Sequence, residues 1–222
     1  MPAKLNRLAR TATAVAAATA LTVAAATAHA QVASLLIARS GIRTDSPHVG
    51  TYHFLELFQT RGDWVFPDLG AVDFSHDTYR ELFAGAGRTL YNGKQVTWVE
   101  ELYFVQATGP AARSARYLWP WTLVDVRFTS QLTSEVVYFP YVPLNGSAHI
   151  QHVLERAKAE YAPSHAWKLG AGYGAYQYGG QPWQNRPFVT TTFSTSVGAF
   201  EFWVQKLPGG AQVQVRYQRR LR

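Results

Sequence analysis

The chain has 222 residues, with 21 Lys and Arg against 14 Asp and Glu, and it is 47% hydrophobic and 14% aromatic. The absence of cysteine excludes a disulfide scaffold and any Cys-ligated metal or redox centre. A chain this apolar and aromatic is not intrinsically disordered, and its length suits one domain with a sizeable core.

The first thirty residues have the pattern of a secretory signal peptide. Lys4, Arg7 and Arg10 precede an apolar run that ends in the small-x-small site Ala28-His29-Ala30. This pattern predicts a cleaved signal peptide over residues 1–30 and a single domain over residues 31–222. A mitochondrial transit peptide and a retained membrane helix are the alternatives. The continuous apolar core and the Ala-x-Ala ending favour secretion.

Removal of that segment changes the charge balance. After residue 30, 18 Lys and Arg remain against 14 Asp and Glu, so the net charge falls from +7 to +4. Much of the apparent basicity therefore belongs to the targeting segment, and we expect no nucleic-acid partner. The same part of the chain has no run of eighteen apolar residues, so we expect no membrane-spanning helix in it.

Eleven segments after residue 30 are predicted to be strands, because they alternate in polarity or are rich in β-branched and aromatic residues. In chain order they are 51–60, 64–74, 79–91, 95–107, 117–128, 135–142, 150–163, 167–178, 188–197, 200–205 and 212–218. Turn residues separate several of them, as at Arg61-Gly62-Asp63 and Asn92-Gly93-Lys94. Many short strands with tight turns indicate an all-β sandwich or a closed barrel.

Segment 150–163 is the one whose secondary structure is hardest to predict from its polarity pattern. Val153, Ala157, Ala159 and Tyr161 share one parity, whereas Arg156, Lys158 and Glu160 share the other, and Leu154 and Glu155 interrupt the alternation. We predict a strand, with a short helix as the alternative because Ala, Glu, Lys and Arg favour helices.

The last two segments predict a hairpin around Leu207-Pro208-Gly209-Gly210. In the final strand, Val213, Val215 and Tyr217 occupy one face, and Gln212, Gln214, Arg216 and Gln218 occupy the other. Upstream, Gly170, Gly172 and Gly174 share one face of their strand, where they leave room for a neighbour or fit a tight curve.

Alternation alone does not say whether the apolar parity faces a core or lipid. Aromatic residues near predicted strand ends favour lipid, because transmembrane barrels carry aromatic girdles at both interfaces. They are Trp64, Tyr91, Trp119, Trp121, Tyr138, Tyr141, Tyr161, Trp167, Tyr178, Trp203 and Tyr217. Ordinary core aromatics are the alternative interpretation.

Two segments resemble known barrels. GAFEFWVQKLPGGAQVQVRYQ, residues 198–218, resembles the terminal hairpin of bacterial outer-membrane barrels, except that QRRLR follows Tyr217 where such chains usually end. HFLELFQTRGDWVFPDLGAVDF, residues 53–74, is similar to the first hairpin of the twelve-stranded nucleoside-channel family. The resemblance implies an antiparallel, up-and-down transmembrane β-barrel. Its strand number would be even, ten or, if residues 33–39 form a first strand, twelve.

Charged residues in mid-strand are the candidates for a polar network in the lumen of such a barrel. They are Glu100, Asp125, Arg127, Arg156, Glu201 and Arg216. Glu201 and Arg216 lie on the more polar parity of the final hairpin, so we expect them to interact inside the barrel.

The compact catalytic candidate is Ser75, His76 and Asp77, but adjacent residues on a strand point apart, and a polar turn is the favoured interpretation. His149 and His152 have a helical spacing within an extended segment, so we expect no metal site. The sequence indicates no cofactor and favours a non-enzymatic role.

Three functions follow from these patterns. The first is an outer-membrane barrel in a bacterial envelope that contacts lipid and serves structurally or as a narrow channel for a small solute. Arg219, Arg220 and Arg222 would contact anionic headgroups. The second is a secreted or periplasmic lipocalin-like barrel that binds an apolar ligand. The third is an outer-membrane lipid-modifying hydrolase that uses Ser75 and His76. The oligomeric state stays open.

Overall fold

The computed structural model describes residues 32–45, 48–74, 78–112, 114–146 and 149–221. Residues 32–222 form one compact unit. The predicted signal peptide over residues 1–30 lies outside the described residues, and so do Ser75, His76 and Asp77. No helix in the described part of the chain is long and apolar enough to cross a membrane.

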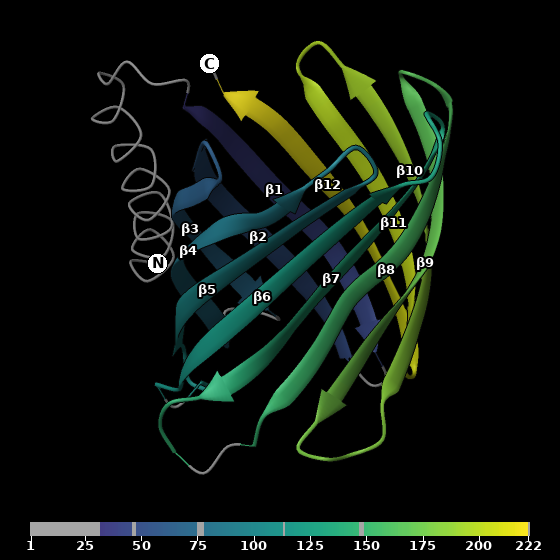
Figure 1. Ribbon diagram of the computed structural model, residues 1–222. Coiled ribbons are helices and arrows are strands. Elements are labelled where there is room, and N and C mark those ends of the chain that lie inside the picture. The colour runs from purple at the N-terminus through teal and green to yellow at the C-terminus, as the bar shows by residue number, and fades with distance from the viewer. Residues whose placement is uncertain (1–31, 46–47, 75–77, 113, 147–148, 222) are drawn as a thin grey trace, which may run out of the picture. The chain divides into compact units, whose positions relative to one another are not determined.

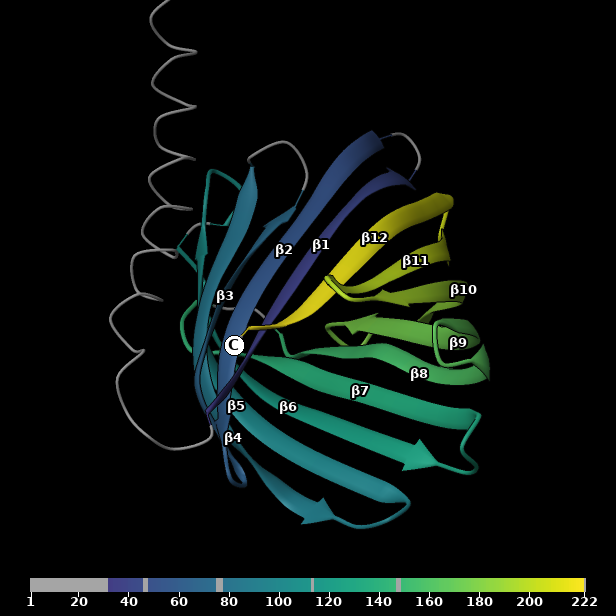
Figure 2. The same cartoon turned by 90° about the horizontal axis from the view of Figure 1, so that it is seen from above.

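The described residues form twelve strands that close into one antiparallel barrel (Figure 1). The strands are β1 (Ala33–Asp45), β2 (His48–Arg61), β3 (Trp64–Phe74), β4 (Tyr79–Asn92), β5 (Val96–Thr108), β6 (Arg116–Arg127), β7 (Leu132–Pro143), β8 (Gln151–Ser164), β9 (Trp167–Tyr178), β10 (Gln184–Thr195), β11 (Gly198–Leu207) and β12 (Gly210–Leu221). Each strand pairs with the next one along the chain, and β1 closes the ring against β12 (Figure 2). The prediction of an antiparallel barrel is confirmed, with twelve strands because residues 33–45 form the first.

The ambiguous segment forms β8, a strand paired with β7 on one side and β9 on the other. The helix alternative is therefore wrong. Helix propensity differs by only tenths of a kcal/mol among most residues, and two ladders of hydrogen bonds outweigh it.

The two ends of the barrel differ in their connections. β1 begins and β12 ends at what we call the terminus end, where short turns join the strands: 62–63, 93–95, 128–131, 165–166 and 196–197. At the opposite end, the loop end, several connections are longer, including 109–115, 144–150 and 179–183.

The apolar parity of the strands faces outward. In β12, Val213 is 55% exposed, whereas the neighbouring Gln212 and Gln214 are 8% and 7% exposed. Leu82, Phe104, Val189, Phe202 and Val204 are likewise exposed on other strands. A soluble barrel places such residues inside, so this arrangement is the one expected of a wall that faces hydrocarbon.

Bulges interrupt several strands, and those in β3 and β8 affect residues of the lumen. In β3 the register shifts between Val65 and Asp68, and both of these residues are buried inside the barrel. In β8, Glu155 is an extra residue opposite β7, because Val137 pairs with Arg156 and Tyr138 pairs with Leu154. This bulge explains why the alternation of polar and apolar residues fails at Leu154 and Glu155.

The glycines of β9 lie on the inward parity, as their shared face predicts. A Cβ on Gly172 would lie 2.5 Å from Phe188 Cζ and 2.6 Å from the Ala157 carbonyl oxygen. The missing side chain therefore leaves room for the Phe188 ring of β10, which covers the glycine.

Candidate functional site

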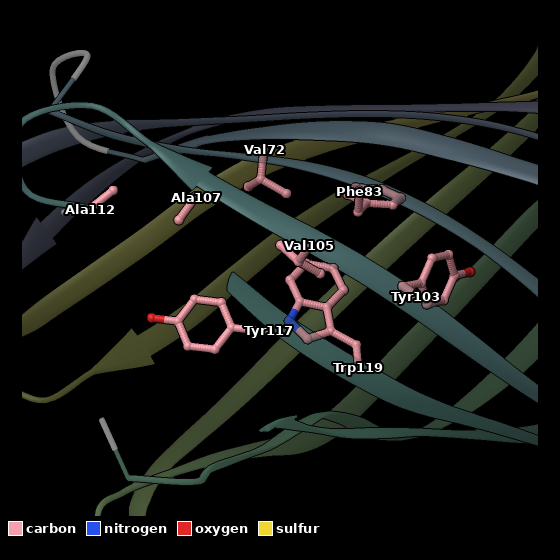
Figure 3. Close-up of a cluster of buried hydrophobic side chains, with 8 residues drawn as sticks. All are labelled: Val72, Phe83, Tyr103, Val105, Ala107, Ala112, Tyr117 and Trp119. Atoms are coloured by element: carbon pink, nitrogen blue, oxygen red, sulfur yellow. The ribbon is translucent and has the colours of Figure 1, made fainter. Parts of the chain in front are cut away.

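One side of the lumen is lined by aromatic rings from β2 to β7, which we call the aromatic wall. Phe83, Tyr103 and Trp119 form its centre (Figure 3), with ring centroids 5.5 Å apart for Phe83–Tyr103 and for Phe83–Trp119. Trp119 also packs edge-on against Tyr141, with centroids 4.8 Å apart. Such tilted and edge-to-face pairs are favourable arrangements of aromatic quadrupoles, so the wall is a packed and ordered surface.

Buried carboxylates lie within the aromatic wall and accept hydrogen bonds from tyrosine hydroxyls. Glu81 accepts from Tyr79 at 2.8 Å and from Tyr141 at 3.2 Å. The hydroxyl of Tyr103 lies 2.8 Å from Asp68 and 2.5 Å from Glu101. The two tyrosine hydroxyls satisfy Glu81, whereas Tyr103 has one proton for two carboxylates, and Asp68 Oδ1 has no hydrogen-bond partner among the described residues.

A second cluster of side chains crosses the lumen, and we call it the charge network. It consists of Arg39, Glu135, Glu155, Arg156, Lys158, Glu160, Lys168, Glu201 and Arg216. Arg39 of β1 forms an ion pair with Glu155 of β8, and Arg156 pairs with both Glu155 and Glu135. Strands β9 to β12 separate β1 from β8 on the shorter side, so the Arg39–Glu155 pair bridges opposite walls.

Lys158 extends the charge network from β8 to Glu201 of β11. Its Nζ lies 2.7 Å from Glu201 Oε1 and 3.2 Å from Glu160 Oε1. Arg216 Nη1 lies 3.4 Å from Glu201 Oε2. Lys158, Glu201 and Arg216 are buried, and buried charges are tolerated only when they are paired in this way.

A cavity of about 600 Å³ occupies the lumen on the loop-end side of this network. The aromatic wall bounds one side of it. The other side comes from β1 and β8 to β12. It combines polar residues with apolar and aromatic ones: Arg39, Arg43, Gln205, Gln212 and Gln214 on the one hand, and Leu154, Tyr176, Tyr178 and Trp203 on the other. Arg39 and Glu155 line the cavity and also form the crossing ion pair, so the charge network is its floor.

The predicted polar network is brought together in part. Arg156, Glu201 and Arg216 belong to the charge network. Asp125 lies beside it, because its Cα partner across the β6–β7 ladder is Glu135. Arg127 is exposed at the terminus end of β6.

Glu100 does not lie in the lumen. It occupies the outward parity of β5, where it accepts hydrogen bonds from Trp98 Nε1 at 2.6 Å and from Thr122 Oγ1 at 2.8 Å. Its neighbour Glu101 takes the inward position. The two adjacent acids have opposite parities, and sequence alone did not say which of them faces inward.

The aromatic residues predicted to form girdles also divide between the outer face of the barrel and its lumen. Trp64, Tyr91, Tyr161 and Trp167 are exposed at strand ends beside the short turns. In contrast, Trp119 and Trp203 are buried inside, and Trp121, Tyr141 and Tyr178 line the cavity. The expectation that all of these rings lie at the barrel's outer rims is therefore wrong for these five.

Several network residues were not among the predicted ones. Arg39 lies in a segment that was only a conditional first strand, and Glu135 lies in a run dominated by Val, Tyr and Phe. Glu155 sits at the bulge, where parity gives no orientation. Lys158 and Glu160 share the parity of Arg156, and that signal was sufficient to find them.

Within the described residues, no group of three or more His, Asp or Glu side chains has a geometry that would hold a metal ion.

A closed antiparallel barrel with an apolar exterior and a polar lumen is the architecture of outer-membrane barrels. The twelve-stranded porins have the same fold. A structure titled KdgM porin aligns with a TM-score of 0.63 at 10% identity, over 85% of this chain and 99% of that one. A NanC porin structure aligns at 0.59 with 10% identity, over 84% and 99% of the two chains. An outer membrane channel from Pseudomonas putida F1 aligns at 0.56 with 12% identity, over 86% and 95%. No protein-family model and no curated protein matches the sequence.

Proposed function

We propose that the chain is a channel of the bacterial outer membrane that admits a small solute into its cavity and passes it through a narrow constriction. The observation that carries this proposal is the cavity of about 600 Å³ inside a closed barrel, with the Arg39–Glu155 ion pair across its floor. The three porin and channel structures support it through their fold. One further KdgM structure is titled as a complex with disordered oligogalacturonate.

The direction of the channel follows from its connections. Bacterial outer-membrane barrels have short periplasmic turns and longer extracellular loops. The terminus end would therefore face the periplasm, and the cavity would open to the outside of the cell. The predicted signal peptide over residues 1–30 supports export across the inner membrane. Exposed Arg219 and Arg220 at the terminus end would meet lipid headgroups.

The charge network is the constriction in this proposal. Opposite charges that meet across a lumen exclude ions and solutes unless water finds a continuous path between them. The network holds Arg39 and Arg156 against Glu155, so passage requires either a gap beside this pair or its separation.

The test is single-channel conductance in planar bilayers for the wild type and for the double variant Arg39→Ala/Glu155→Ala. We expect the double variant to conduct at least twice as well, because the crossing pair is removed without leaving an unpaired partner at that bridge. The matched control is Arg80→Ala/Asp73→Ala, a pair 3.4 Å apart on the outer face. It should conduct as the wild type does. No conductance in either the wild type or the lumen variant would overturn the channel proposal and leave a structural role.

The soluble-carrier alternative is disfavoured by the exposure of Val213, Phe104 and Leu82 on the outer wall. A carrier of apolar ligands would place these side chains inside.

A further inference from the structure

We propose that Asp68 and Glu101 share one proton in the folded barrel at neutral pH, which makes the aromatic wall a pH-sensitive element of the fold. Both acids contact the hydroxyl of Tyr103, a residue that lines the cavity. The inference goes beyond the proposed channel function and does not depend on it. It rests on the number of protons in this contact, on the burial of the two acids, and on the charges around them.

The first observation is the number of protons that the contact requires. Tyr103 Oη lies 2.8 Å from Asp68 Oδ2 and 2.5 Å from Glu101 Oε2, and both are hydrogen-bond distances. Each of these contacts needs a hydrogen between its two oxygen atoms. The tyrosine hydroxyl supplies one hydrogen, and an ionised carboxylate supplies none. The second hydrogen therefore belongs to one of the two acids.

The second observation is burial. Asp68 is 1% exposed and Glu101 is 8% exposed, so solvent does not readily replace the missing donor. Asp68 Oδ1 has no hydrogen-bond partner among the described residues. If Asp68 were ionised, this atom would be a charged oxygen buried without a donor. If Asp68 is protonated and donates through Oδ2, the same atom is a neutral carbonyl oxygen. Burial therefore favours Asp68 as the site of the proton.

The third observation is the charge around the pair. The strongest electrostatic influences on Asp68 come from Glu56 and Glu101, which are both acids. Glu56 of β2 acts on Glu101 as well. Arg39 and Arg216 act on Glu56. Two carboxyl groups that share one site do not both ionise readily, because their charges repel each other.

Two glycines of β4 allow the acids to meet. Asp68 comes from β3 and Glu101 from β5, and β4 lies between these strands. A Cβ on Gly85 would overlap the Tyr103 ring, and a Cβ on Gly87 would overlap Glu101 Cγ. The side chains of β5 can therefore extend across β4 toward Asp68. The other residues next to the pair are Glu56 of β2 and the uncharged β6 partners of Tyr103 and Glu101, which are Trp119 and Trp121.

The shared proton links folding to pH. In the unfolded chain, solvated Asp and Glu side chains release their protons near pH 4. Above that pH, folding takes up one proton from the solvent to form the carboxyl O–H bond. The stabilising contribution is therefore complete at acid pH and decreases as the pH rises, until the folded barrel also releases the proton.

Infrared spectroscopy of the full chain tests for the proton itself. A protonated carboxyl group has a carbonyl stretch at a higher frequency than a carboxylate, and a detergent without ester groups leaves that region clear. We expect the band at pH 7 in the wild type. It should be lost in Asp68→Asn and in Glu101→Gln, because the new amide and the Tyr103 hydroxyl together supply both hydrogens.

Glu81→Gln is the matched control for this measurement. Glu81 is also 1% exposed, but Tyr79 and Tyr141 each bring a hydrogen to it, so it needs no proton of its own. The band should persist in this variant. Absence of the band from the wild type, or an equal band in the wild type and both amide variants, would overturn the inference. Loss of the band in Glu81→Gln alone would assign the proton to Glu81 and would overturn it too.

Urea unfolding in detergent micelles at pH 6 and pH 7 measures the linkage. Comparison with the amide variants removes the contributions of other titrating groups. Relative to Asp68→Asn and to Glu101→Gln, we expect the unfolding constant of the wild type to rise about tenfold between pH 6 and pH 7, the effect of one proton. Glu81→Gln should retain the pH dependence of the wild type. The same pH dependence in the wild type and both amide variants would contradict the proposal, whether or not the barrel conducts.

Discussion

Arg156 has more acidic partners than most residues of the charge network. It is 3% exposed and pairs with both Glu135 and Glu155. The same Glu155 pairs with Arg39, so one carboxylate serves two arginines. Removal of one partner from a buried ion pair is strongly destabilising because the remaining charge stays buried without compensation.

We therefore expect Arg156→Met to lower the free energy of unfolding by about 3 kcal/mol. The measurement is the urea midpoint of unfolding in detergent micelles or lipid vesicles. Arg127→Met is the control, since Arg127 is exposed at the end of β6, and a surface change should alter stability by less than about 0.5 kcal/mol. Equal stability of the two variants would contradict a buried network.

At the scale of single strands, β8 and β9 depend on local irregularities. The bulge at Glu155 turns both Glu155 and Arg156 toward the lumen, which a regular strand does not do with adjacent residues. In β9 the inward glycines leave space for Phe188 and Thr190 of β10.

We expect Gly172→Val to destabilise the barrel by about 1–3 kcal/mol, because the new side chain would overlap the Phe188 ring and the Ala157 carbonyl oxygen. Ala171→Val is the matched control on the same strand, since Ala171 is exposed on the outward parity. The comparison is made by thermal unfolding of the two variants in the same detergent. A Gly172→Val variant as stable as the control would show that the inward face of β9 has free space.

The strands themselves could largely be predicted from the sequence. Segments 64–74 and 167–178 have their predicted bounds, and regular alternation fixed the faces of β12. The network was harder to predict, because parity fails at a bulge and does not decide between adjacent acids such as Glu100 and Glu101. Contacts across the lumen, such as Arg39 with Glu155, depend on which strands face each other after closure, and local sequence does not contain that information.

At the scale of the whole molecule, closure pairs every strand on both sides and leaves no open edge. Such barrels can withstand detergent at room temperature and unfold on heating. We expect unheated protein in dodecyl sulfate to migrate faster on a gel than heated protein, because the folded barrel is more compact. A single mobility with and without heating would contradict a closed and stable barrel.

The apolar parity of the wall faces outward, toward lipid in the proposed channel, and the polar parity faces the lumen. The native chain has no cysteine, so single cysteines introduced at Val213, Val215, Gln212 and Gln214 of β12 give unambiguous labelling sites. Each variant is labelled with a fluorophore and reconstituted into vesicles that contain lipids with a nitroxide on the acyl chain. We predict strong quenching at positions 213 and 215 and little quenching at positions 212 and 214. Strong quenching at 212 and 214 with none at 213 and 215 would contradict it.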